Sequence, residues 1–131
     1  MLKQRIITAL ALLAVLLPAL FADTPQAFLV LSILLIAAGA WEWANMNGLS
    51  RLQAVFSGLA CASLCCLAWW SGWTTQTSTW LWSLAGSAWV GITAWMLMRG
   101  VQGWSVWPRQ WRWVLGVLLL SLAWLAMAQA R

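Results

Sequence analysis

The sequence predicts an all-α fold, a polytopic membrane protein built as a bundle of about five transmembrane helices. The 131-residue chain is 64% hydrophobic and only 7% charged, a balance outside the range of soluble domains. Its apolar residues form continuous runs close to the roughly 20 residues that cross a bilayer, whereas barrel strands alternate apolar and polar positions. Residues 1–131 are therefore predicted to form one transmembrane region.

The five predicted spans are bounded by polar or turn-forming residues. They cover residues 2–21, 25–45, 52–70, 80–98 and 108–128. The short connections between them force neighbouring spans to run antiparallel.

Local start and stop signals support these boundaries. Thr24 before Pro25 predicts a helix start, because proline at the first helical position loses no hydrogen bond. Gly48 predicts a left-handed end to the second span. Ser50 and Gln53 have the spacing of a capping box at the start of the third.

The basic residues predict that the amino terminus is cytoplasmic. With that orientation only Arg131 falls on the far side, and the near side receives Lys3, Arg5, Arg51, Arg99, Arg109 and Arg112. Four or six spans would spoil this asymmetry. The net charge of +5 is thus interpreted as a topology signal with some attraction to anionic lipid, and no nucleic-acid partner is predicted.

The first run has a competing interpretation as a cleaved signal peptide. Lys3 and Arg5 precede the apolar stretch, and Ala22 offers a cleavage point. We favour a retained span, because the run is long for a signal peptide and another span follows almost at once.

The fourteen tryptophans are interpreted as membrane anchors and packing residues, since indole rings suit the membrane interface. Eleven are expected near span ends: Trp41, Trp43, Trp69, Trp70, Trp73, Trp80, Trp82, Trp104, Trp107, Trp111 and Trp113. Three are expected deeper in the membrane: Trp89, Trp95 and Trp124.

The third span carries small residues at every fourth position, which predicts a ridge for close helix contact. The ridge consists of Ala54, Gly58, Ala62 and Cys66. Cys61 and Cys65 are interpreted as ordinary small apolar residues. The chain has no histidine, so metal ligation by its three cysteines is poorly supported.

Two stretches are candidates for a lipid-headgroup or interface site. In "RGVQGWSVWPRQWRW", Arg99, Arg109 and Arg112 alternate with tryptophans, so arginine could hold a lipid phosphate while the indoles lie in the headgroup layer. Diffuse attraction of a basic loop to anionic lipid is the simpler alternative.

The second candidate is "WEW", formed by Trp41, Glu42 and Trp43. A carboxylate in a span is a functional candidate by default. Glu42 lies close to the cytoplasmic end of its span, however, where an ion pair with Arg51 or another basic loop residue would explain it. Both interpretations stay open.

The opening "MLKQRIITALALLAVLLPALF", followed after one more span by "AWEWANMNGLS", resembles the amino-terminal end of bacterial phosphatidate cytidylyltransferases, or CDP-diglyceride synthases. The order and spacing of the two stretches are similar, and the rest of the chain matches in hydropathy. That family makes CDP-diacylglycerol and pyrophosphate from CTP and phosphatidate, with magnesium, at the cytoplasmic face.

The resemblance implies that catalysis belongs to sequence this chain lacks. The family's nucleotide and metal site comprises lysines, aspartates and a His-Gly-Gly segment near the carboxyl end of a chain about twice as long, and none of it is present. Asp23 and Glu42, the two acidic residues, are predicted on opposite faces of the membrane and cannot share a metal. No catalytic, cofactor or metal residue is therefore assigned.

The resulting expectation is the amino-terminal membrane portion of such an enzyme, in the bacterial inner membrane and inactive alone. Its expected partners are membrane lipids, including phosphatidate, with CTP and magnesium only in the complete enzyme. The alternative is a self-contained small membrane protein that acts as a subunit or scaffold. A homo-oligomer is compatible with either expectation.

Overall fold

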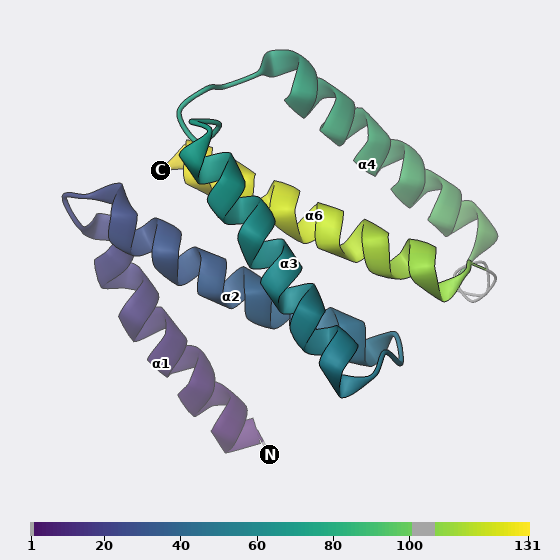
Figure 1. Ribbon diagram of the computed structural model, residues 1–131, viewed down its shortest axis with the longest axis horizontal. Coiled ribbons are helices and arrows are strands. Elements are labelled where there is room, and N and C mark those ends of the chain that lie inside the picture. The colour runs from purple at the N-terminus through teal and green to yellow at the C-terminus, as the bar shows by residue number, and fades with distance from the viewer. Residues whose placement is uncertain (1, 101–106) are drawn as a thin grey trace.

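The computed structural model describes residues 2–100 and 107–131, with the side chains of residues 2–5 and 8 left out (Figure 1). The described residues form helices without strands. These are α1 (Leu2–Phe21), α2 (Pro25–Met46), α3 (Arg51–Trp70), α4 (Thr79–Arg99) and α6 (Arg109–Ala130). Each helix matches a predicted span to within two residues at either end. Trp104, one of the predicted interfacial tryptophans, lies outside the described residues.

Four of these helices, α2, α3, α4 and α6, are long and apolar enough to cross a membrane. The all-α, multi-pass fold class is therefore confirmed. In α1 the apolar stretch within the described residues is shorter and covers Ala9–Phe21. The fifth span stays a prediction.

The turn between α2 and α3 forms as its sequence predicts. Gly48 has φ 71°, and the N–H of Leu49 donates to the carbonyl of Ala44 at 3.1 Å, which closes α2. The Gln53 N–H then donates to Ser50 Oγ at 3.3 Å, and the Ser50 N–H donates to Gln53 Oε1 at 3.0 Å. This short turn makes α2 and α3 antiparallel neighbours.

The core lies where α3 crosses α2 and α6 (Figure 1). A side chain at Gly58 would lie 2.9 Å from the backbone oxygen of Ala37, so α3 approaches the backbone of α2 closely there. Eight buried residues form the core cluster: Leu29, Ile33, Ala40, Cys61, Cys65, Val117, Trp124 and Leu125.

The small-residue face of α3 differs from the predicted ridge. Its buried members are Ala54, Ser57, Gly58, Cys61 and Cys65. Cys66 is exposed, so its predicted place in the packing face was wrong. An α-helix has 3.6 residues per turn, so a strict spacing of four rotates by about 40° per step and leaves the contact after three steps. Spacings of three and four keep Cys61 and Cys65 in the core.

Beyond its first turn, where Leu81 and Trp82 pack against the core cluster, helix α4 stands apart from this core (Figure 1). It has no buried residue, and its backbone does not closely approach any other helix in the described part of the chain. A polar contact ties its first turn to the end of α6, where Trp82 Nε1 donates to Gln129 Oε1 at 2.8 Å.

Because the helices run antiparallel, several basic helix ends lie on the same side of the bundle, which we call the basic end. The α2–α3 turn, the end of α4 and the start of α6 all lie there, and the carboxyl terminus lies at the other end (Figure 1). Its described basic side chains are Arg51, Arg99, Arg109 and Arg112. This arrangement matches the segregation of charge on which the predicted cytoplasmic orientation depends.

Candidate functional site

The three residues of "WEW" point in different directions, because successive residues on a helix are about 100° apart. Trp41 lies on the side of α3, where its Cβ would be 3.6 Å from a side chain at Gly58. Trp43 lies against α6. Glu42 is exposed between them. The motif is therefore not a single cluster.

Trp43 joins α2 to α6. Its Nε1 donates to the backbone carbonyl of Arg112 at 3.1 Å, and its indole ring occupies the space that a side chain at residue 116 would need. Gly116 is thus required for the ring to fit. The sequence predicted an interfacial anchor, and the structure gives Trp43 a helix-packing role as well.

Glu42 makes no ion pair with Arg51 or with any other side chain that the structure describes. It lies four residues before the last residue of α2, about 6 Å along the helix axis. A carboxylate that close to the helix end can reach water at the interface. Its location thus requires no salt bridge.

Arg99 ends α4 and stacks on a neighbouring indole. Its guanidinium carbon lies 5.3 Å from the ring centroid of Trp95, a cation–π arrangement. Trp95 in turn lies 5.8 Å from Trp107, with the two rings tilted by 55°. Two residues of the predicted mixture, Arg99 and Trp107, are therefore joined through Trp95, which the sequence predicted deeper in the membrane.

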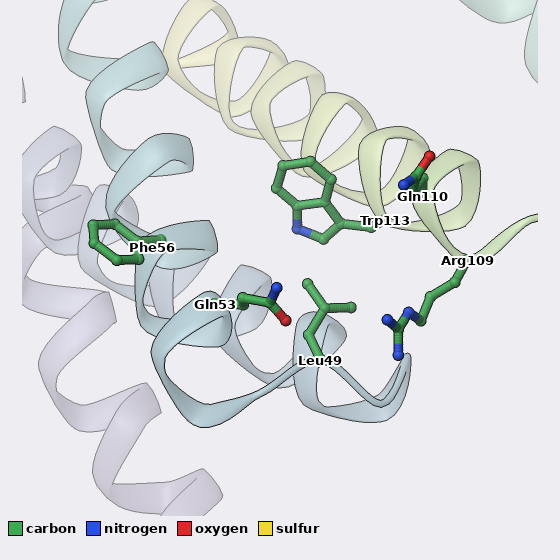
Figure 2. Close-up of a pocket in the computed structure, with 6 residues that line it drawn as sticks. All are labelled: Leu49, Gln53, Phe56, Arg109, Gln110 and Trp113. Carbon is green, nitrogen blue, oxygen red and sulfur yellow. The ribbon is translucent and has the colours of Figure 1, made fainter.

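Arg109 reaches from the start of α6 across to the α2–α3 turn, where its Nη1 donates to the carbonyl of Gly48 at 3.0 Å. The side chain borders a pocket of about 320 Å³ between this turn, α3 and α6 (Figure 2). The residues that line it are Leu49, Gln53, Phe56, Arg109, Gln110 and Trp113.

The pocket combines a polar rim with apolar walls (Figure 2). Arg109 supplies a positive charge, and Gln53 and Gln110 supply amides. The indole of Trp113 is fixed by its Nε1, which donates to Ser57 Oγ at 2.7 Å. One cation beside apolar walls suits an amphiphile with a negatively charged end.

Arg112 is partly buried beside this region. Its Nε atom is enclosed, and no acceptor among the described residues reaches it. A buried guanidinium N–H without a partner is energetically costly.

The structure thus separates the predicted site residues. The Trp43 indole N–H donates to the backbone carbonyl of Arg112, Arg109 belongs to the pocket, and Arg99 lies at the end of α4. The sequence did not identify the other pocket residues as a group. The capping box indicated where Gln53 would lie, but no pattern indicated that α6 would cross beside it.

Two tryptophans, Trp113 and Trp124, donate hydrogen bonds to buried serine hydroxyls and so join helices within the bundle. Trp124 is completely buried, and its Nε1 donates to Ser32 Oγ at 3.0 Å, which joins α6 to α2. Trp113 joins α6 to α3 in the same way through Ser57. These contacts extend the packing role that the sequence suggested for tryptophan.

The described residues do not fit a magnesium site. They contain no cluster of three metal-ligating side chains. Asp23 precedes the first residue of α2, and Glu42 lies 17 residues into the helix from Pro25, roughly 26 Å along its axis. Magnesium is held by adjacent oxygen ligands, so these two carboxylates cannot share an ion.

No family model matches the chain, and no solved structure matches it.

Proposed function

We propose that this chain is the amino-terminal membrane portion of a bacterial phosphatidate cytidylyltransferase, located in the inner membrane with its basic end in the cytoplasm. In this proposal the chain receives phosphatidate at the basic end and leaves nucleotide chemistry to residues it does not contain. The resemblance of its first 50 residues suggests the family, and the amphipathic pocket beside Arg109 is the observation that carries the lipid role.

The chemistry of the pocket supports an acidic lipid as ligand. An arginine guanidinium carries five N–H donors, and Arg109 uses one of its nitrogens on Gly48. Its other N–H donors can bind a phosphate, because two donors of the planar guanidinium can pair with two phosphate oxygens. Phe56 and Trp113 offer apolar surface for the first part of an acyl chain.

The proposal predicts binding of the lipid without turnover. The purified chain in detergent should retain dioleoyl phosphatidate and give no CDP-diacylglycerol when CTP and magnesium are added. Formation of CDP-diacylglycerol would overturn the proposed division of roles.

The Arg109→Gln variant tests the pocket. It should weaken phosphatidate binding about fivefold, as expected for one arginine at a membrane surface. Arg51→Gln is the matched control, because Arg51 is exposed at the same end and does not line the pocket. Equal losses in the two variants would indicate diffuse attraction instead of a site.

A second candidate function is a stand-alone subunit or scaffold. The observation that favours it is α4, whose residues are all at least partly exposed. The intact mass of the gene product from its own membranes separates the candidates. A mass of 14.5 kDa would favour the subunit, and about twice that mass would favour the enzyme portion.

A further inference from the structure

An apolar groove of about 490 Å³ runs between α4 and α6, separate from the pocket at Arg109. Its α4 wall consists of Trp82, Ala85, Ala88, Trp89 and Ile92. Its α6 wall consists of Leu119, Leu120, Leu122, Ala123 and Ala126. The groove exists because α4 packs against the core only through its first turn, at Leu81 and Trp82, and the alanines along the groove leave the space between the helices open.

Both walls lead to an arginine at the basic end. Arg99 follows Ile92 by seven residues on α4, and Arg112 precedes Leu119 by seven residues on α6. Seven residues make nearly two full turns, so each arginine lies on the groove side of its helix, about 10 Å beyond the groove residues. The groove therefore has a positively charged mouth.

The side chains on the α4 side of the mouth pack against one another. The Arg99 guanidinium lies over Trp95, and Trp95 packs against Trp107 next to the start of α6. On the α6 side, Arg112 has an enclosed Nε atom, so an anionic oxygen atom at the mouth would pair with the outer nitrogens of its guanidinium.

We infer that the groove between α4 and α6 binds one anionic phospholipid from the surrounding bilayer, with an acyl chain along the groove and its phosphate between Arg99 and Arg112. This site is independent of the pocket at Arg109 and of the proposed enzyme family. The acyl chain of the bound lipid fills the groove between α4 and α6.

Charge favours a lipid over a second copy of the chain. A copy in the same orientation would bring its own basic end to the mouth, so arginines would face arginines. The chain has two acidic residues to offset seven basic ones; Asp23 lies at the opposite end of α2, which leaves Glu42 as the single acidic residue near the basic end. The positive charge at the basic end attracts an anionic lipid headgroup.

Native mass spectrometry of the full chain in detergent tests the site. With dioleoyl phosphatidylglycerol added, we expect one tightly retained lipid, and with dioleoyl phosphatidylcholine we expect little retention. The Arg99→Gln/Arg112→Gln double variant should reduce retention about tenfold or more. Arg51→Gln should retain the lipid as the unaltered chain does, because Arg51 lines neither the groove nor the pocket.

A variant that fills the groove tests the acyl-chain part. Ala123→Phe projects a ring into open space at the α6 wall, so it should fold normally and lose the retained lipid. Equal retention of the two lipids would overturn headgroup recognition. Full retention by Ala123→Phe would overturn the location, and a dimer mass lost in that variant would identify a second copy as the occupant instead.

Discussion

The core of α2, α3 and α6 and the separate helix α4 are made from the same kind of sequence, yet they pack in opposite ways. All four helices are long and apolar enough to span a membrane. In the core, glycines and other small residues allow close contact, and indole N–H groups bond across the helices. Helix α4 has its own glycines and tryptophans but buries none of them.

The position of a small residue or an indole therefore decides what it does in a membrane. Lipid is as apolar as the side chains, so hydrophobicity alone does not draw helices together. Close contact requires a facing small surface, and an indole N–H stabilises the contact only where a carbonyl or hydroxyl lies opposite. The core helices have both facing small surfaces and indole hydrogen bonds. Helix α4 has the hydrogen bond alone, from Trp82 to Gln129.

The largest expected effect comes from Gly58→Ala in the core. The new Cβ would lie 2.9 Å from a backbone oxygen of α2, so the two helices must separate. We expect the free energy of unfolding in mixed detergent micelles to fall by about 2 kcal/mol, followed by circular dichroism. Gly91→Ala in α4 is the control, because nothing lies within 4 Å of its position. Equal losses would erase the distinction between the two regions.

Trp124→Phe should have the next largest effect. It removes the indole N–H that bonds to Ser32 and leaves a void in the core, so the free energy of unfolding should fall by about 1–2 kcal/mol. A double-mutant cycle with Ser32→Ala should give a coupling energy of about 0.6 kcal/mol. The matched change Trp89→Phe in α4 should cost less than about 0.5 kcal/mol. No measurable coupling with Ser32 would show that the indole acts through volume alone.

Gln129→Ala tests how α4 is attached. The Gln129 amide donates to the carbonyls of Trp73 at 2.7 Å and Gln76 at 2.9 Å and accepts from Trp82. Losing these bonds should raise hydrogen exchange in residues 73–82 and lower the free energy of unfolding by only about 1 kcal/mol. Gln110→Ala should leave the exchange there unchanged. Unchanged exchange in Gln129→Ala would mean that α4 is held by other contacts.

The smallest effect is expected for Cys66→Leu. Cys66 is exposed, so a larger apolar side chain should change the free energy of unfolding by less than about 0.5 kcal/mol. Cys65→Leu should cost about 2 kcal/mol, because Cys65 is buried in the core. The reverse order, measured by the same detergent titration, would restore the four-residue ridge that the sequence suggested.

The sequence predicted helix positions well, because its signals are local. Continuous apolar runs gave the lengths, and Gly48 and the Ser50–Gln53 box marked a turn that depends only on adjacent residues. Rotation of a helix about its axis is harder to predict, because it depends on the partner. The error at Cys66 arose in this way, from a spacing that fits four residues per turn instead of 3.6.

The candidate site was predicted only in part, for the same reason. Its arginines and tryptophans were evident from their position at span ends, but the pocket beside Arg109 requires the crossing of α3 and α6. The groove requires α4 to stand away, and α4 satisfies the same length and hydropathy criteria as the packed helices. Contact between two helices depends on both of their surfaces, so the sequence of one helix alone does not determine it.

The bond between Trp82 and Gln129 has a consequence for the order of assembly. Gln129 follows the end of α4 by 30 residues, so α4 gains this hydrogen bond only after α6 has been synthesised and inserted. A helix that is exposed on every side can lie in lipid until then, and α4 has no buried residue that would need a protein neighbour. Arrival of α6 then closes the bundle from its last turn, through one amide that holds both α4 and the loop preceding it.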